Sequence, residues 1–363
     1  MRAIQVDTDC EGPLVLNDNA FELCREFLAP HGDRFFRQIS RYDDLLADVL
    51  RRPDYRSGAT LRLILPFLKG AGLTNARLEE FSRRTLTCMP GARQVSRFLL
   101  RLGIPLFMVS TSYRQFALAA AHELGLQEDR VFCTHLDLDA LPLPEAEKLE
   151  LERLKEQILA APDLAPDPGA AGPEHLPSSV RETIGLFDRI FQEVIPGMEV
   201  GRSYREITPL GGPEKVRALH ESLEQTRLTL ADVLYVGDSI TDVEAFQAVQ
   251  EGGGVAVSFN GNRFAVEAAE IIVVSDSAWS VALLISIFRR WGKDGVLELA
   301  AMTRTAQQKV LAIPESEIEP LMTGLQGKKF NLYHTARMDR EKVARESLEM
   351  RAQLRGAAIA ALG

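Results

Sequence analysis

The chain has 363 residues, 46% of them hydrophobic, and it carries a formal net charge of −9 at pH 7. Its length allows two domains, or one core domain with large insertions, and its apolar fraction can fill a sizeable core. The negative charge argues against a general nucleic-acid binder, because phosphate backbones select for Lys and Arg.

Neither secretion nor a membrane span is predicted. No apolar run reaches about 18 residues, and no basic segment followed by an apolar one opens the chain. The four cysteines have neither a C-x-x-C pair nor a zinc spacing, so we expect free thiols in a reducing compartment. We therefore expect a cytoplasmic protein that contacts no membrane.

The first predicted elements are a strand and a helical module. Residues 3–9 form an apolar run that is typical of a short buried strand. Asn17, Asp18 and Asn19 then precede a segment with helical spacing, and Asn and Asp are good N-caps. From about residue 20 to residue 95 the chain is rich in Leu, Arg and Phe at helical spacing, which predicts a helical module outside the sheet.

A second strand is predicted at residues 104–109, directly before the hydroxyl-bearing residues 110–112. A helix is expected to follow through Leu124, with Gly125 as its C′ residue, and then a strand at 131–134. Between about residues 138 and 205 the composition changes. The expected elements there are a charged amphipathic helix at 149–159, a loop or linker rich in Pro, Ala and Gly at 160–177, and a helix at 179–194.

The rest of the chain alternates helices and strands before a charged tail. The expected elements are helices at 214–223 and 241–249 and strands at 233–236, 255–259 and 271–274. Strands that alternate with helices predict an α/β fold with a Rossmann-like, doubly wound parallel sheet. The tail from about 295 to 363 is predicted to be helical, and it could pack on the core or mediate self-association.

The predicted organisation is therefore one core interrupted by two insertions and followed by an extension. The boundaries are 1–14, 96–137 and 206–294 for the core, 15–95 for a helical cap, 138–205 for a second and partly irregular insertion, and 295–363 for a helical C-terminal extension.

Asp9 and Asp238 are the most informative pair of residues, because each follows a predicted strand. In an open α/β sheet, carboxylates at the carboxyl ends of strands converge on the crevice where ligands bind. Acids clustered there repel one another. A bound cation such as Mg²⁺, which prefers oxygen ligands, would relieve that cost.

Further residues extend the pattern in chain order. The full set is Asp9, Ser110, Lys215, Asp238 and Asp242. This order of acid, hydroxyl, ammonium and two acids resembles the haloacid dehalogenase superfamily of phosphohydrolases. The segment Gly-Asp-Ser-Ile-Thr-Asp at 237–242 matches the superfamily's G-D-S/G-x-x-D motif, and residues 254–262 are similar to family members as well. The resemblance implies a HAD-like core whose insertions are caps.

The resemblance also implies Mg²⁺-dependent hydrolysis of a phosphomonoester through an aspartyl-phosphate. A carboxylate can attack phosphorus covalently, and a metal ion between carboxylates clamps the transferring group. A hydroxyl and an ammonium would hold the equatorial oxygens. The implied phosphate-binding residues are Ser110, Thr111 and Lys215, and the implied metal ligands are Asp9, Glu11, Asp238 and Asp242.

Two registers are open for the first motif. In one, Asp9 attacks and Glu11 is the acid/base, which aligns residues 8–14 with the family's T-D-x-D-G-T-L and puts Gly12 where a flexible turn is wanted. In the other, Asp7 attacks and Asp9 is the acid/base, which gives an unaltered D-x-D. The glycine favours the first register, although that register leaves Asp7 at a strand position that is usually apolar.

The first motif departs from the superfamily pattern, because Glu11 and Pro13 replace the usual Asp and Thr. D-C-E-G-P-L followed by N-D-N-A-F-E resembles proteins labelled energy-converting hydrogenase A subunit R in methanogens, and their bacterial relatives. That resemblance implies the same superfamily and an association with a hydrogenase locus. A weakly catalytic or non-catalytic accessory protein that binds such a partner is therefore a second hypothesis.

A receiver-type phospho-switch is a third and weaker hypothesis, because it also groups acids, a hydroxyl and a Lys. The chain is too long for a receiver, and its last motif is an acid where a receiver has Lys.

The substrate hypotheses rest on fewer observations. Asn17 and Asn19 follow the first motif and Arg114 follows the second, so each could face the cleft. The expected partner is a small phosphorylated metabolite. A sugar phosphate, a phosphoserine-like metabolite and a nucleotide all stay open, since specificity would lie in the caps. The C-terminal helices could also support a homo-oligomer or a protein complex.

Overall fold

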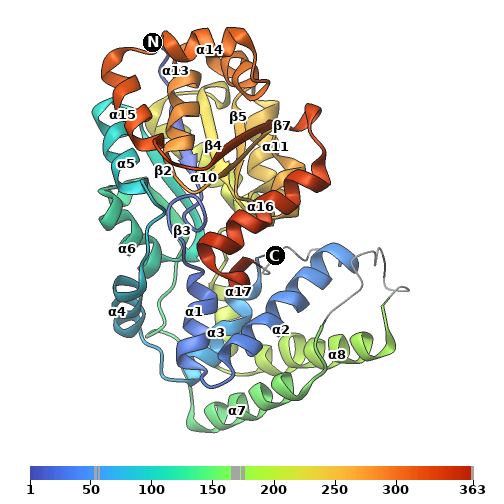
Figure 1. The fold of residues 1–363 in the computed structure, drawn as a ribbon. Coiled ribbons are helices and arrows are strands. Elements are labelled where there is room, and N and C mark those ends of the chain that lie inside the picture. The colour runs from blue at the N-terminus through green and yellow to red at the C-terminus, as the bar shows by residue number, and fades with distance from the viewer. Residues whose placement is uncertain (53–54, 56–57, 165–171, 173–175, 361–363) are drawn as a thin grey trace.

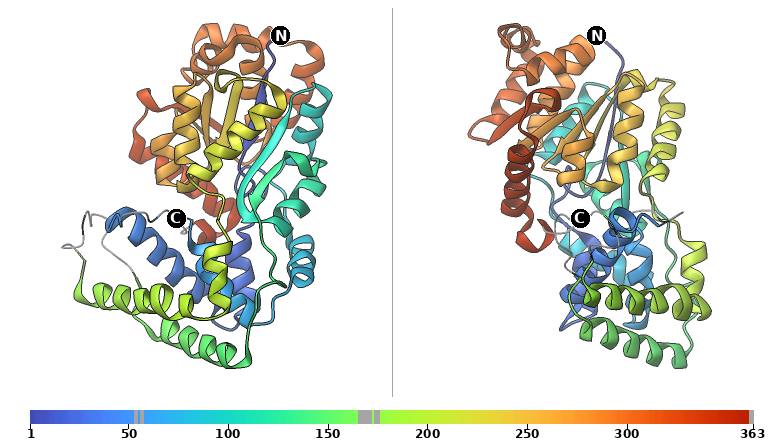
Figure 2. Two further views of the ribbon diagram at one scale, coloured as in Figure 1. Left: turned by 180° about the vertical axis from the view of Figure 1, so that it is seen from behind. Right: turned by 90° about the vertical axis from the view of Figure 1, so that its right-hand side faces the viewer.

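The computed structural model describes residues 1–52, 55, 58–164, 172 and 176–360, which form two lobes (Figure 1). One lobe holds a sheet with helices on both faces, and the other is built of helices alone. Figure 2 shows from two further sides that the helical lobe lies beyond one end of the sheet lobe. The predicted linker at 160–177 lies for its greater part outside the described residues.

The sheet has seven strands in the order β3-β2-β1-β4-β5-β6-β7. Neighbours among the first six pair in parallel, and β7 pairs antiparallel with β6 at one edge. The bounds are β1 (Gln5–Thr8), β2 (Leu106–Tyr113), β3 (Val131–Thr134), β4 (Val233–Gly237), β5 (Val255–Phe259), β6 (Ile271–Ser275) and β7 (Phe330–His334). The expected α/β fold with a mostly parallel sheet is confirmed, and its strand order is consistent with a Rossmann-like fold.

The order of the strands creates a crevice next to β1. The chain adds β2 and β3 on one side of β1 and then β4, β5 and β6 on the other. In such a sheet, ligands bind outside the carboxyl ends of the strands, at the point where the winding reverses. Asp9 follows β1 and Asp238 follows β4, so the topology brings these two carboxylates together.

Helices cover both faces of the sheet. They are α5 (Ala92–Arg101), α6 (Arg114–Leu124), α10 (Pro213–Thr226), α11 (Val243–Glu251), α12 (Arg263–Ala268) and α13 (Trp279–Ala300), with the short 3-10 helices η2 (Glu128–Arg130), η7 (Leu230–Asp232) and η8 (Ile240–Asp242). Leu234 and Val236 pack into a cluster with α5, α6 and α13, whereas Val233 and Tyr235 pack with α10, α11 and α12. This alternation is that of a strand buried on both faces. Gly125 ends α6 with a φ of 73°, as expected.

Both insertions build the helical lobe. The first contributes α1 (Asn19–Phe27), α2 (Gly32–Asp44), η1 (Leu45–Val49), α3 (Thr60–Gly70) and α4 (Asn75–Thr85), and the second α7 (Glu145–Ala160), α8 (Ser178–Asp188), η4 (Arg189–Val194), η5 (Ile195–Gly197), η6 (Val200–Arg202) and α9 (Ser203–Glu206). One hydrophobic cluster contains residues of both. The ring of Tyr42 stacks on Phe191 and meets the edge of Phe187, each at 5.5 Å between centroids. The two insertions therefore form a single cap.

The C-terminal extension differs from the expectation of a wholly helical tail. It contains α14 (Arg304–Leu311), α15 (Glu315–Leu325), the strand β7, η9 (Thr335–Arg337), α16 (Arg340–Arg355) and α17 (Ala357–Ala360). The strand forms because the chain returns to the free edge of β6, where Leu332 pairs with Val273. The alternation of Leu332 with polar neighbours is a weak local signal, so the long-range pairing decides the structure.

Two of the predicted boundaries fall inside helices. Helix α5 begins at Ala92, before the expected core boundary at residue 96. Helix α13 has a kink at Gly292, and its second segment runs through the expected boundary at residue 295. Within the part of the chain that the structure describes, no helix is both long and apolar enough to cross a bilayer.

Helix α16 runs from the sheet lobe to the junction of the lobes (Figure 1). Val343 and Met350 pack it against the α10–α12 side of the sheet, and Ile359 of α17 enters the hydrophobic cluster of the cap. The extension therefore joins the core to the cap.

If the two insertions share one core, removing a ring from the second should destabilise the whole cap. We expect Phe187→Ala to lower the free energy of unfolding by about 3–5 kcal/mol, because the side chain is fully buried. Chemical denaturation followed by circular dichroism measures this, with Glu182→Ala on the exposed face of α8 as the control. Equal stability of the two variants would contradict a shared core.

Candidate functional site

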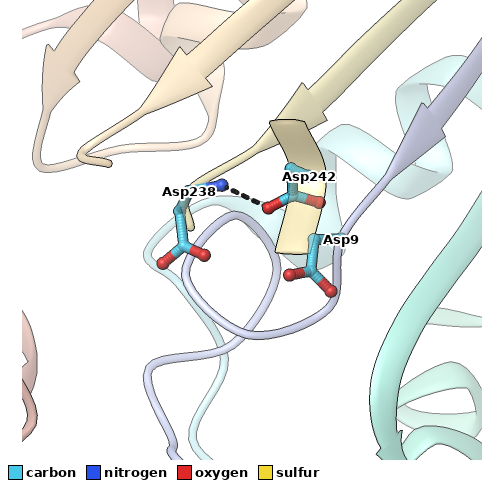
Figure 3. A group of neighbouring side chains, drawn as sticks. All are labelled: Asp9, Asp238 and Asp242. Carbon is cyan, nitrogen blue, oxygen red and sulfur yellow. Dashed lines mark hydrogen bonds between the residues drawn. The ribbon is translucent and has the colours of Figure 1, made fainter. Parts of the chain in front are cut away.

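Three buried carboxylates meet at the carboxyl ends of β1 and β4. Asp9, Asp238 and Asp242 each offer an oxygen, and these oxygens all lie within 4.8 Å of one another. Figure 3 shows Asp9 and Asp238 in the loops after β1 and β4 and Asp242 on the short helix η8, with the three side chains gathered beside the strand ends. All three residues are nearly inaccessible to solvent. Such a group could hold a metal ion, because it consists of oxygen donors alone.

Asp9 is held in place from both sides of its carboxylate. Its backbone N–H donates to Val236 at 2.8 Å, which continues the parallel pairing beyond β1. The backbone N–H of Cys10 donates to Oδ1 at 2.7 Å, and Nζ of Lys215 lies 3.1 Å from Oδ2. The side chain therefore has a fixed direction before any ligand binds.

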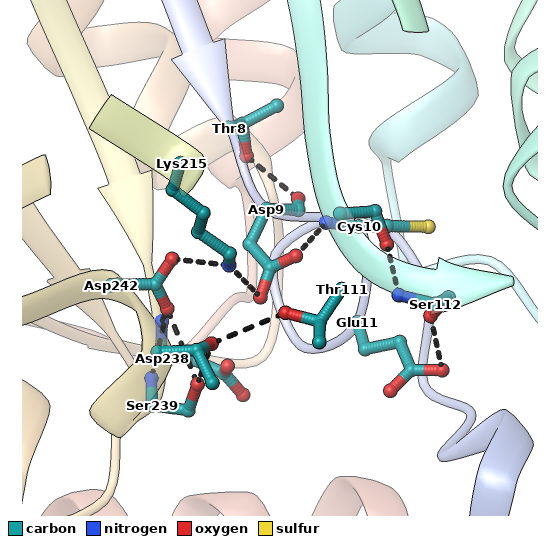
Figure 4. A network of polar contacts seen from close by, with 12 residues as sticks. Thr8, Asp9, Cys10, Glu11, Thr111, Ser112, Lys215, Asp238, Ser239 and Asp242 are labelled. Atoms are coloured by element: carbon teal, nitrogen blue, oxygen red, sulfur yellow. Dashed lines mark hydrogen bonds and ion pairs between the residues drawn. The ribbon is translucent and has the colours of Figure 1, made fainter. Parts of the chain in front are cut away.

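Lys215 lies between two carboxylates in the interior of the protein (Figure 4). It stands in the first turn of α10, is fully buried, and donates to Oδ1 of Asp242 at 2.6 Å as well as facing Asp9. Burial disfavours the ammonium, but Asp242 and Asp9 outweigh it and raise the pKa of Lys215 above its ordinary value. Lys215 is therefore a permanent cation at the centre of the site.

Asp242 uses both carboxylate oxygens within the protein. Oδ1 accepts from Lys215 and from the hydroxyl of Tyr235 at 2.9 Å. Oδ2 accepts from the backbone N–H groups of Asp238 at 3.0 Å and Ser239 at 3.1 Å. Asp242 thus fixes Lys215 and the loop after β4, and it has less freedom to bind a metal directly than Asp9 or Asp238.

Two glycines allow the backbone to pass close to the clustered carboxylates. Gly12 has a φ of 94°, and a Cβ there would lie 2.2 Å from Oδ2 of Asp238. A Cβ on Gly237 would lie 2.3 Å from Cγ of Asp242. Both positions therefore exclude a side chain, which explains why the two motifs contain glycine here.

The carboxyl of Asp9 carries an electrostatic cost. Burial raises its pKa to about 7; Lys215 acts against that rise, while Asp242 and Asp238 add to it. A divalent cation bound between Asp9 and Asp238 would stabilise the charged form. The physical chemistry of the cluster therefore favours a cation, as the sequence predicts.

The predicted phosphate-binding hydroxyls lie at the end of β2, which continues to Tyr113. Ser110 is fully buried, and its Oγ accepts the backbone N–H of Ser112 at 3.1 Å. Thr111 and Ser112 line the cavity beside Asp9, and Thr111 donates to Oγ1 of Thr241 at 3.4 Å. Among the predicted phosphate-binding hydroxyls, the structure therefore exposes Thr111 to the cavity and leaves Ser110 beneath the lining.

Glu11 lines the same cavity but stands apart from the three clustered aspartates. Its Oε1 accepts from the backbone N–H of Asn19 at 2.8 Å and from Oγ of Ser112 at 2.9 Å. Burial, and then the neighbouring charge of Asp18, raise the pKa of Glu11 to about 8. Its position agrees better with the predicted acid/base role than with the predicted role as a metal ligand.

Asp7 lies away from the cavity. Its carboxylate accepts from Oγ of Ser222 at 2.6 Å and from Nε2 of Gln5 at 2.7 Å, and it is fully buried between β1 and α10. The Gln5 amide and the Ser222 hydroxyl explain how a carboxyl group is tolerated inside the sheet lobe. This placement favours the register in which Asp9, and not Asp7, faces the ligand.

The three predicted substrate residues have different environments. Asn17 donates to Glu22 and to the carbonyl of Thr85, so its amide shapes the loop that enters the cap. Arg114 pairs with Glu128 at 3.0 Å on the surface, outside the cavity lining. Asn19 lines the cavity and is 1% exposed, and neither of its side-chain amide atoms has a hydrogen-bond partner among the residues that the structure describes. Of the three, Asn19 is the one placed to contact a substrate.

The core, the first insertion and the C-terminal helix α16 all contribute residues to the lining of the cavity. Its volume is about 120 Å³. The described residues of the first insertion that line it include Phe36, Ser40, Asp43 and Thr60, and those of the extension are Arg351 and Arg355. No described residue of the second insertion lines it. The first insertion therefore covers the site, and the second insertion packs against the first without reaching the cavity in its described residues.

Sequence reasoning missed Arg351 and Arg355 of α16. Nη1 of each guanidinium pairs with Oδ2 of Asp238, at 3.0 Å for Arg355. A charged C-terminal helix is an ordinary solvent-exposed feature, so nothing in its local pattern marks these two arginines. Their role depends on a contact across 113 and 117 positions of the chain.

Comparison with known proteins identifies the fold and no activity. No protein-family model matches the chain, and no curated protein matches it. The chain is similar to the structure of gene product AF1437 from Archaeoglobus fulgidus, with 28% sequence identity, a TM-score of 0.79 and 99% of each chain covered. The likeness therefore extends over the insertions and the C-terminal extension as well as the core.

The buried carboxyl of Asp7 predicts a dependence of stability on pH. Burial raises its folded pKa to about 7, above the ordinary value of 3.8, so its ionisation destabilises the folded state increasingly between about pH 4 and pH 7. We expect Asp7→Asn to be more stable than the wild type at pH 8, by about 2–4 kcal/mol, and to show little gain at pH 4. Rotation of the Gln5 amide would supply the new acceptor.

Chemical denaturation of both proteins at the two pH values measures this difference. The same replacement at the exposed Asp163 should have no comparable effect, because that side chain is 60% exposed. A gain for Asp7→Asn that is equal at pH 4 and pH 8 would contradict an ionisation effect.

Proposed function

We propose that this chain is a Mg²⁺-dependent phosphatase of the HAD type, which hydrolyses a small phosphomonoester through an aspartyl-phosphate on Asp9. The observation that carries the proposal is the buried Asp9–Lys215–Asp242 network with Asp238 beside it at the carboxyl ends of β1 and β4. A permanent cation and a directed carboxylate at this place suit an electrophile that carries negative charge.

The proposed metal ion fits the donors that are present. The clustered side chains are all carboxylates, which are the ligands that Mg²⁺ prefers. Asp9 and Asp238 would hold it, with Asp242 acting through Lys215 and the loop after β4. When bound, the ion would screen the phosphate from the nucleophile and neutralise charge on the transferring group.

The protein side chains account for each bond that forms and breaks. An oxygen of Asp9 bonds to phosphorus as the bond to the leaving oxygen breaks, and that oxygen takes a proton from Glu11. Thr111, which lines the cavity, holds a transferring oxygen, and Lys215, which lies beneath the lining, orients Asp9 and adds positive charge behind it. Glu11 then accepts a proton from water, which attacks phosphorus, releases phosphate and restores Asp9.

The cavity favours a small and polar substrate. Its lining is largely polar and includes Asp9, Thr111 and Asp238, and its volume of about 120 Å³ accommodates a phosphoryl group. Asn19 presents a donor and an acceptor that no described protein group satisfies. Buried polar groups are normally hydrogen-bonded, so a substrate hydroxyl or amide that enters the cavity would find a partner in this side chain.

Replacing the nucleophile tests the proposal. We expect Asp9→Asn to lower phosphatase turnover by about 10³-fold or more, because a carboxamide cannot form the acyl-phosphate. The assay is a broad panel of phosphate esters with Mg²⁺ and with chelator. Asp7→Asn is the matched control, since it makes the same change two residues earlier and should keep its activity. Turnover that persists in Asp9→Asn, or that chelator does not reduce, would reject the proposal.

Asn19 should act on substrate binding. We expect Asn19→Ala to raise KM by about 10-fold for the best substrate, since one hydrogen bond to a neutral group contributes about 1.5 kcal/mol at most. The contact of its backbone N–H with Glu11 stays in place, so kcat should change less. Steady-state kinetics measure both constants, and Asn17→Ala compares a nearby asparagine outside the cavity lining. An unchanged KM would exclude the substrate contact.

A second function has one observation in its favour. Two guanidinium groups contact Asp238, and such contacts would compete with a metal at that oxygen. This favours a weakly catalytic or non-catalytic accessory protein, of the hydrogenase-associated kind that the sequence resembles. Co-purification with a partner, together with no turnover across the ester panel by folded protein, would support that function over the phosphatase.

A further inference from the structure

Two arginines of the C-terminal helix converge on one oxygen of Asp238. Nη1 of Arg351 and Nη1 of Arg355 both contact Oδ2, and the two arginine side chains are 4% and 3% exposed. Among the described residues, no hydrogen bond reaches the other oxygen, Oδ1. The carboxylate is thus held by one oxygen, and its second oxygen is left for another ligand.

The arginines also hold the backbone around Asp238. Nη1 of Arg351 lies 3.3 Å from the carbonyl of Asp238. Arg355 donates from Nε to the carbonyl of Leu16 at 3.0 Å and from Nη2 to the carbonyl of Asn17 at 2.6 Å. One guanidinium therefore ties the segment that enters the cap to the loop after β4.

Helix α16 is itself anchored close to this point. Oγ of Ser347 donates to the carbonyl of Gly261 at 2.7 Å, and the residue is fully buried. Val343 and Met350 pack on the core. Because these contacts fix α16 before Arg351, and Ile359 of α17 packs in the cap after it, the two guanidinium groups have little freedom to leave Asp238.

We infer that Arg351 and Arg355 are positioning residues for the metal site. They fix Oδ2 of Asp238, so that Oδ1 is presented to a divalent cation shared with Asp9. Groups that hydrogen-bond a metal ligand fix its orientation, and their loss typically weakens metal binding. The inference rests on the proposed metal-dependent function, and it assigns the C-terminal extension to the metal site.

Two other roles for the arginines give opposite predictions. If the guanidinium groups occupy the place of the cation, removing one positive charge should tighten metal binding, because like charges repel. If they bind the substrate anion, their loss should raise KM and leave metal affinity unchanged or tighter. Of the three roles, only the positioning role predicts that removing a guanidinium weakens metal binding, even though a repelling positive charge is lost.

The test is calorimetric titration of the full-length chain with MgCl₂ in the absence of substrate. The variants are Arg351→Gln, Arg355→Gln and Arg351→Lys. The last keeps the charge but loses the planar fork that holds a carboxylate. Arg345→Gln is the matched control, because Arg345 lies on the same helix and is exposed. Circular dichroism and thermal melting select the variants that keep the wild-type fold.

We expect the Kd for Mg²⁺ to rise by roughly 10- to 100-fold in the three site variants and to stay unchanged in Arg345→Gln. The Mg²⁺ concentration for half-maximal turnover should rise by the same factor, and saturating Mg²⁺ should recover most of kcat. Loss of fold in one variant leaves the other two to decide, and loss of fold in all three would overturn a specific positioning role.

The failures of the two proposals are distinguishable. Wild-type protein that binds Mg²⁺ with variants that bind equally or more tightly would overturn the positioning role alone. Wild-type protein that binds no Mg²⁺ would overturn the metal site, and the positioning role with it.

Discussion

The site depends on one electrostatic constraint, which is that several carboxylates are buried at the same edge of a sheet. Lys215 forms ion pairs with Asp9 and Asp242, and the two arginines of α16 form ion pairs with Asp238. These cations offset part of the repulsion between the carboxylates. Burial of unpaired charge is costly, so each carboxylate in the cluster requires a cation or several hydrogen-bond donors. The fixed loops and the two close glycine contacts follow from that requirement.

The same constraint explains why parts of the chain that are far apart in sequence meet at one place. Charged side chains from four separate segments contact one another at the site. The segments are the first motif, the loop after β4, the first turn of α10 and the end of α16. The first insertion covers that volume, and the second insertion packs behind it through a common hydrophobic core. The extension then links the two lobes, because Ile359 packs in the cap while Met350 packs on the sheet lobe.

An arrangement that involves the whole chain is consistent with the comparison to the protein from Archaeoglobus fulgidus, whose likeness covers 99% of both chains. The phosphatase and the accessory protein are distinguished by how Asp238 is used. In the first proposal the arginines would orient a metal ligand, and in the second they would neutralise a carboxylate that has no catalytic role.

The sequence by itself determined the strands of the parallel sheet, the helical character of the insertions and the convergence of Asp9 with Asp238, because these follow from local periodicity and from the rule that strand ends meet in a crevice. It left Asp7 and Asp9 as alternatives, and it gave Asn17 and Asn19 equal weight. Only the tertiary structure distinguished the members of each pair. Packing places Asp7 against Ser222, and it leaves the side-chain amide of Asn19 without a hydrogen-bond partner among the described residues. The strand β7, the single core of the cap and the pairing of Arg351 with Asp238 were likewise decided by contacts between distant segments, for which a local pattern carries no signal.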